Sequence, residues 1–124
     1  MTGASVLYVE DNEFNRKIVR QLLSRTRYRL REAVDGEAAL GMVREECPDL
    51  ILMDVQLPKM SGLEVTRMLR NDPVTAAVPV IVVTSFALSG DDRRAMAAGA
   101  SAYIAKPYSP RELLALIQTF LPEG

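Results

Sequence analysis

Carboxylate side chains follow directly after two short apolar runs of the chain. Glu10 and Asp11 come after the run Val6–Val9, and Asp54 comes after the run Leu50–Met53. A buried parallel strand that ends in a carboxylate places it at the sheet edge where open α/β proteins bind ligands. A single aspartate that closes a strand is more often a turn or capping residue. Its role therefore depends on what the remaining chain places beside it.

Two further apolar runs end in groups that complement a carboxylate. Thr84 follows the run Val80–Val83, and Lys106 follows the run Ala102–Ala105. A hydroxyl can donate a hydrogen bond to an anion, and the lysine ammonium is a compact positive charge. Taken singly, the threonine could be a sheet-end hydroxyl without a role, and the lysine could be a simple ion-pair partner. Taken together, the four strand ends indicate a reactive site.

Acids that converge at one edge need a cation between them, because neighbouring carboxylates raise one another's pKa. The chain contains no histidine, which excludes imidazole bases, histidine metal ligands and a phosphohistidine on this chain. Oxygen ligands without histidine favour Mg²⁺ over Zn²⁺, with water and a main-chain carbonyl near Gln56 completing the shell. Such a site suits phosphoryl transfer, in which Lys106 neutralises the phosphoryl oxygens and Asp54 forms an acyl phosphate.

Strand and helix patterns alternate five times along the chain. The expected strands are Val6–Val9, Tyr28–Val34, Leu50–Met53, Val80–Val83 and Ala102–Ala105. Strands separated by helices at this length form a parallel sheet with helices on both faces. We predict an α/β protein with the flavodoxin-like doubly wound (βα)5 sandwich, whose five-stranded parallel sheet has the order 2-1-3-4-5. In that order the first and third strands are neighbours, so Asp11 and Asp54 meet at one crevice.

The helix patterns predict which side chains face the core. Phe14, Ile18 and Leu22 recur at helical spacing, with Val19 and Leu23 beside them, and we expect this stripe to be buried. Capping signals predict that later helices begin near Ser61 with Glu64, near Gly90, and at Ser109 or Pro110.

Composition limits the class of protein. With 124 residues, of which 48% are hydrophobic, the chain can bury one core, so we expect a single domain over residues 1–124. The net charge of -1 predicts no nucleic-acid partner and no membrane partner. The single cysteine, Cys47, cannot form an internal disulfide, and we expect it to be buried. The start of the chain lacks a signal-peptide pattern, which favours a cytoplasmic protein. We expect a monomer or weak dimer.

Four motifs resemble the receiver domains of two-component response regulators. They are VEDN at residues 9–12, DLILMDVQLPKMSG at 49–62, PVIVVTS at 79–85 and GASAYIAKP at 99–107. They occur in the family's order and cover nearly the whole chain, which makes the combination specific. Among receivers, EDNEFN, ILMDVQLP and SGLEVT are most similar to the stand-alone, DivK-like type.

The resemblance implies a role for each acid. Asp54 would accept a phosphoryl group from a phosphohistidine on a histidine kinase or histidine phosphotransfer protein. Asp11 and Asp54 would bind Mg²⁺ together with the main-chain carbonyl of Gln56. Glu10 stands where many receivers have aspartate, and it would act on the metal directly or through water.

The resemblance also implies a switch. Thr84 and Lys106 would bind the phosphoryl group, Tyr103 would turn inward behind Thr84, and the bond from Lys106 to Pro107 would be cis. We expect the segment Phe86–Ala98 to move most. The surface of the fourth helix, the last strand and the last helix would then change and regulate downstream protein targets.

The resemblance implies a single-domain response regulator without an effector domain. Such a protein would be a signalling switch rather than an enzyme, and its expected setting is cell-cycle or cell-division control. It would assist its own Mg²⁺-dependent phosphorylation and dephosphorylation.

Exposed basic residues suggest two contact surfaces. Arg16 and Lys17 are candidates for a kinase-facing surface, and Arg93, Arg94 and Arg111 for an output surface. Both sets could equally be solvated helix faces.

Three other functions compete with this interpretation. A haloacid-dehalogenase-type hydrolase has a second aspartate two residues after the nucleophile, where this chain has Gln56. A flavodoxin needs a phosphate-binding first loop, but Glu10 and Asp11 would repel phosphate. The third alternative is a receiver that acts by docking alone, without phosphorylation.

Overall fold

The structure, a computed structural model, describes residues 3–85 and 90–122. Strands and helices alternate along it from the amino terminus. In chain order they are β1 (Ser5–Val9), α1 (Glu13–Leu23), β2 (Arg29–Ala33), α2 (Gly36–Glu45), β3 (Leu50–Asp54), α3 (Gly62–Arg70), β4 (Val80–Thr84), α4 (Asp91–Ala98), β5 (Ala102–Ala105) and α5 (Pro110–Phe120). The strands form one parallel sheet in the order β2-β1-β3-β4-β5, which confirms the predicted topology.

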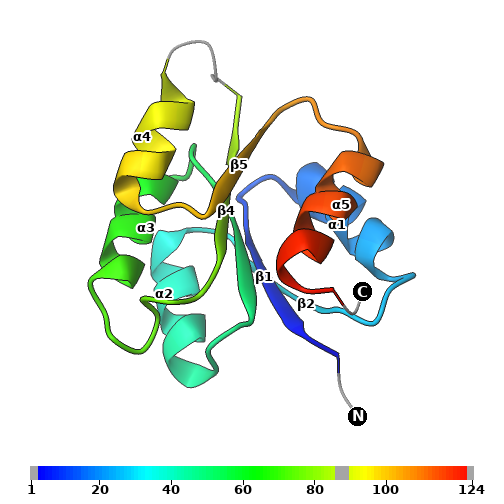
Figure 1. The fold of residues 1–124 in the computed structure, drawn as a ribbon, viewed down its shortest axis with the longest axis horizontal. Helices are drawn as coiled ribbons and strands as arrows, with labels where there is room; N and C mark the ends of the chain where they lie inside the picture. The colour runs from blue at the N-terminus through cyan, green and yellow to red at the C-terminus, as the bar shows by residue number, and fades with distance from the viewer. Residues whose placement is uncertain (1–2, 86–89, 123–124) are drawn as a thin grey trace.

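Helices cover both faces of the sheet, with α2, α3 and α4 on one side and α1 and α5 on the other (Figure 1). Successive side chains of a strand point to opposite faces, so each strand contributes to two cores. Leu7 and Val9 of β1 belong to the core beneath α2, α3 and α4, whereas Val6 and Tyr8 belong to the core beneath α1 and α5. All residues of β1, β3 and β4 are buried, which explains the uninterrupted apolar runs 6–9, 50–53 and 80–83 within them.

Local capping fixes where the helices begin. The Ser61 side chain accepts a hydrogen bond from the Glu64 backbone N–H, and the Glu64 side chain accepts one from the Ser61 N–H. Ser109 and Glu112 form the same reciprocal pair at α5. Both capping boxes satisfy backbone donors that a helix leaves unpaired at its start.

The predicted buried stripe of α1 is partly wrong. Val19 and Leu23 are buried, but Phe14 is 69% exposed and Ile18 is 36% exposed. Each residue turns an α-helix by about 100°, so the helix face defined by Val19 and Leu23 directs Phe14 and Ile18 away from the sheet. The expected burial of Cys47 is also wrong, because this residue is exposed before Pro48.

Part of the expected mobile segment cannot be assessed, since residues 86–89 lie outside the described part of the chain. Within residues 3–85 and 90–122, every helix is too short or too polar to cross a lipid bilayer.

Candidate functional site

Three carboxylates gather at the carboxyl ends of β1 and β3. These strands are direct neighbours, with Val9 opposite Met53, so Glu10 and Asp54 leave the sheet side by side. One carboxylate oxygen from each of Glu10, Asp11 and Asp54 lies within 4.8 Å of the others. Glu10 and Asp54 are buried, whereas Asp11 is exposed. The sheet thus brings together the acids that the sequence predicted to meet.

Lys106 joins this cluster from the end of β5. Its Nζ lies 3.0 Å from Asp54 Oδ2 and 3.2 Å from Glu10 Oε1. Its backbone N–H donates a 2.7 Å hydrogen bond to the Thr84 carbonyl, and the following bond to Pro107 is cis. One ammonium group therefore serves two buried carboxylates.

The three carboxylates of the cluster carry more charge than the Lys106 ammonium balances, so the site can bind a further cation. Burial raises the pKa of Glu10, and the neighbouring Asp54 raises it further. Burial by itself would lower the pKa of Lys106, but the hydrogen bonds and charges of Asp54 and Glu10 outweigh burial and raise it. Hard oxygen donors with uncompensated negative charge are the ligand set that Mg²⁺ takes in proteins, so the residues fit this ion.

The backbone around β3 and α3 fixes Asp54. Asp54 Oδ1 accepts a 2.9 Å hydrogen bond from the Gln56 N–H. Gly62, the first residue of α3, packs so closely on β3 that a Cβ there would lie 2.0 Å from the Asp54 carbonyl oxygen. The Gly62 N–H also donates a 2.9 Å hydrogen bond to the Val55 carbonyl. The start of α3 therefore determines where the main chain of Asp54 lies.

The sequence did not reveal three donors that contact Glu10. The Tyr8 hydroxyl lies 3.1 Å from Glu10 Oε1, and Asn15 Nδ2 lies 3.4 Å from the same oxygen. The Asn12 N–H donates to Oε2 at 3.1 Å. Tyr8 could have been found, because it precedes Glu10 by two residues and thus points to the same side of the strand.

Thr84 and Tyr103 occupy different environments. Thr84 is buried at the end of β4. Tyr103 is 42% exposed, and in the sheet it lies opposite Val82 rather than at the acid cluster. Tyr103 is thus an exposed side chain here, and its inward movement stays a prediction.

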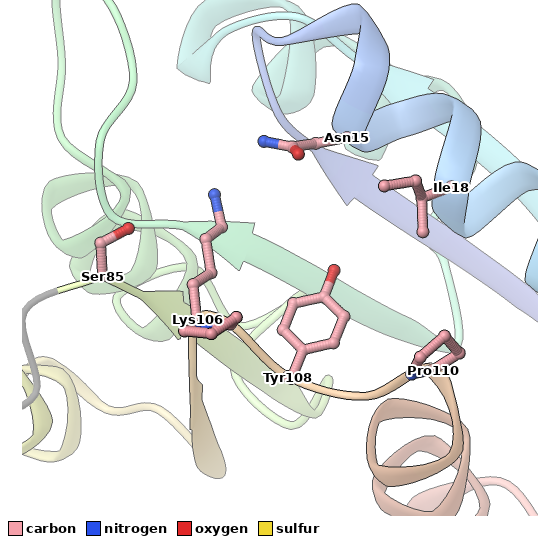
Figure 2. Close-up of a pocket in the computed structure, with 7 residues that line it drawn as sticks. Asn15, Ile18, Ser85, Lys106, Tyr108 and Pro110 are labelled. Atoms are coloured by element: carbon pink, nitrogen blue, oxygen red, sulfur yellow. The ribbon is translucent and has the colours of Figure 1, made fainter.

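A cavity of about 570 Å³ lies beside the cluster, between α1 and the segment that joins β5 to α5. Figure 2 shows the Lys106 ammonium and the Tyr108 hydroxyl pointing the same way, below Asn15 and Ile18. The cavity is lined by Asn15, Ile18, Ser85, Lys106, Pro107, Tyr108 and Pro110.

Arg16, a candidate for the kinase-facing surface, is mostly engaged in contacts within the chain, and its role toward a kinase stays a prediction. Its Nη1 donates to the carbonyls of Glu10 and Asp11 at 3.0 and 3.2 Å, and its Nε lies 3.2 Å from Glu32 Oε1. Its side chain is only 13% exposed, because it ties the acidic loop to α1 and β2. Lys17 is exposed.

The proposed output cations Arg93, Arg94 and Arg111 are exposed on α4 and α5, so their role stays a prediction.

Comparison with known proteins establishes the family. The family model of the response regulator receiver domain matches residues 6–118, so the chain belongs to this family. The polar-differentiation response regulator DivK of Brucella anthropi is 46% identical over 120 residues, which cover 97% of this chain and 98% of the relative. DivK of Brucella ovis shows the same identity and coverage.

Solved structures agree with the fold. The receiver domain of the sensor histidine kinase PA1611 from Pseudomonas aeruginosa PAO1 has a TM-score of 0.90 and 34% identity, covering 98% of this chain and 99% of its own. That domain has a magnesium ion coordinated in its active-site cleft. The chemotaxis response regulator CheY4 of Vibrio cholerae has a TM-score of 0.90 and 30% identity, covering 97% and 100%. The chain is thus a response regulator receiver domain, a signalling switch of two-component systems.

Proposed function

We propose that this receiver is switched by phosphorylation of Asp54. The donor is a phosphohistidine on a histidine kinase or a histidine phosphotransfer protein. A carboxylate oxygen of Asp54 forms a bond to phosphorus while the bond from phosphorus to the imidazole nitrogen breaks, and the imidazole leaves after taking a proton from solvent. The observation that supports this most strongly is Asp54 buried 3.0 Å from Lys106 Nζ, within the acidic cluster.

Mg²⁺ is the proposed cofactor of this reaction. Asp11 and Asp54 would hold it through carboxylate oxygens, Gln56 through its main-chain carbonyl, and Glu10 directly or through water. When bound, the ion supplies positive charge that stabilises the phosphoryl oxygens. Lys106 supplies a second positive charge to the same oxygens, because it already contacts Asp54.

The proposed switch follows from the added charge. Phosphorylation gives Asp54 a group with about two negative charges and three acceptor oxygens. Lys106 and the Thr84 hydroxyl move toward these oxygens, and Tyr103 turns into the space that Thr84 vacates. This selects an altered conformation of the surface formed by α4, β5 and α5, with α4 moving most.

The biological setting is proposed from the relatives. DivK proteins are named for polar differentiation, and their matches span nearly their whole length. We propose that this chain acts on downstream protein targets in cell-cycle or cell-division control, in the cytoplasm, as a single receiver domain. The net charge of -1 supports protein contacts over nucleic-acid or membrane contacts.

Nuclear magnetic resonance can test this proposal with beryllofluoride, a phosphoryl mimic. Spectra of the Mg²⁺ form and of the form with Mg²⁺ and beryllofluoride should differ at the amides of Asp54, Thr84 and Lys106, at Tyr103 and throughout α4. An Asp54→Asn variant, which has no acceptor carboxylate, should give the same spectrum with and without the mimic. Unchanged resonances of Tyr103 and α4 in the wild-type chain would contradict the switch.

A further inference from the structure

The carboxylate of Glu10 is held by more donors than a simple metal ligand requires. Its Oε1 lies within hydrogen-bonding distance of the Tyr8 hydroxyl, Asn15 Nδ2 and Lys106 Nζ. Its Oε2 accepts from the Asn12 N–H. The side chain is only 2% exposed, so solvent cannot replace a donor that is lost.

These donors differ in how firmly they are fixed. Lys106 is shared with Asp54, and Asn15 is only half-buried and makes the longest of the contacts, at 3.4 Å. Tyr8 is fully buried in the middle of the sheet, between β2 and β3, so its ring cannot move without disturbing the core. Tyr8 is therefore the donor whose position the fold determines most strictly.

The Tyr8 hydroxyl donates its hydrogen bond directly to Glu10 Oε1, at 3.1 Å. A buried phenol that donates to a carboxylate forms a charge-assisted hydrogen bond, which is stronger than one between neutral groups.

We propose that Tyr8 is a positioning residue of the metal site: its buried hydroxyl fixes Glu10 so that a carboxylate oxygen stays within reach of Asp11 and Asp54. This inference rests on the proposed function, because it assigns Tyr8 to the Mg²⁺ site proposed there. It also explains how a glutamate serves the site. The extra methylene lets the carboxylate of Glu10 swing further than that of an aspartate, and Tyr8 removes this freedom. When Lys106 turns to the phosphoryl group, Tyr8 remains to hold Glu10.

Mn²⁺ binding measures the effect of the Tyr8 hydroxyl on metal affinity without any phosphoryl transfer. Electron paramagnetic resonance quantifies free Mn²⁺, and competition with Mn²⁺ gives the Mg²⁺ affinity. Tyr8→Phe keeps the ring and removes the hydroxyl, and it should weaken binding about tenfold, at the lower end of the effect of losing a partner of a metal ligand. Tyr28→Phe is the matched control, because Tyr28 is also buried in the same core but donates to the distant Leu121 carbonyl. It should leave the affinity unchanged.

A double-mutant cycle separates positioning from a general structural effect. In a Glu10→Asp chain the shorter carboxylate no longer reaches the Tyr8 hydroxyl, so Tyr8→Phe should change Mn²⁺ affinity less than twofold there. An equal loss in both backgrounds, or no loss in the wild-type background, would overturn the role of Tyr8 while leaving the metal proposal intact. If the wild-type chain bound no Mn²⁺ saturably, the metal proposal and this inference would both fail.

A second measurement needs no folded Tyr8 variant. In a wild-type chain with ¹³C at the tyrosine Cζ atoms, added Mg²⁺ should shift the Tyr8 resonance, because its hydrogen-bond acceptor gains a cation. The Tyr28 resonance should stay in place, and variants at the other tyrosines give the assignments. A Tyr8 resonance that does not respond to saturating Mg²⁺ would overturn the inference.

Discussion

The negative charge of Glu10 is unfavourable in this site even with Lys106 beside it. Its carboxylate is buried, and Asp54 adds a like charge beside it. Both effects raise its pKa above the ordinary value of 4.5. The same acids that can bind a metal ion therefore lower the stability of the metal-free chain. The pH dependence of the free energy of unfolding measures this effect.

The metal-free chain should lose stability as pH rises from about 4.5 through the raised pKa of Glu10. In this window the folded state binds a proton that the unfolded state has released, so the free energy of unfolding falls with increasing pH. Glu10→Gln should reduce the slope of the free energy of unfolding against pH, and Mg²⁺ should reduce the slope of the wild-type chain. Urea unfolding at a series of pH values measures these slopes. Equal slopes in both chains would show that Glu10 is not the group responsible.

The positions of the acids could be predicted from the sequence, because they follow apolar runs and the end of a strand is a local signal. The donors to Glu10 were harder to predict. Asn15 reaches it only because α1 begins beside the end of β1, and Arg16 holds the same loop through carbonyls that no sequence motif reveals. Such contacts depend on how the loop turns, which residue types do not specify.

At the scale of elements, the junction of β3 and α3 positions the acceptor. Gly62→Ala would place a Cβ 2.0 Å from the Asp54 carbonyl oxygen. The backbone must shift, so we expect a loss of about 1–3 kcal/mol in the free energy of unfolding, together with slower phosphorylation of Asp54. Urea unfolding and the time course of phosphorylation measure the two effects.

Gly41→Ala is the control for this change, since nothing lies within 4 Å of a Cβ at Gly41 in α2. There alanine should stabilise the helix by about 0.5–1 kcal/mol and leave phosphorylation unaltered. If both variants behaved alike, the close approach of α3 to Asp54 would have no functional meaning.

Helix faces were predicted less well than helix positions. The apolar spacing in α1 located the helix, but it could not distinguish Phe14, which is exposed, from Val19, which is buried, because both are apolar. Arg70 shows a further limit. Its guanidinium donates to the carbonyls of Gly99 and Val78 at 2.7 and 2.6 Å, joining the ends of α3 and α4 and the start of β4. No local pattern indicates that an arginine will meet these distant loops.

At the scale of the whole molecule, the order of the strands was predictable. Fully apolar runs alternate with helix patterns, and the handedness of parallel crossovers leaves few arrangements. The order β2-β1-β3-β4-β5 then brings residues 10, 54 and 106 together, although they lie far apart in the sequence. The global arrangement was thus easier to predict than the individual side-chain contacts that complete the site.

Phosphorylation of Asp54 is tested most directly by the intact mass of the chain after incubation with acetyl phosphate and Mg²⁺. We expect a gain of one phosphoryl mass on the peptide that contains Asp54. This gain should be absent when EDTA removes the metal and in the Asp54→Asn variant. A chain that gains no phosphoryl mass would contradict the account and favour a receiver that acts by docking alone. A mass gain that persists in Asp54→Asn would contradict the assignment of the acceptor.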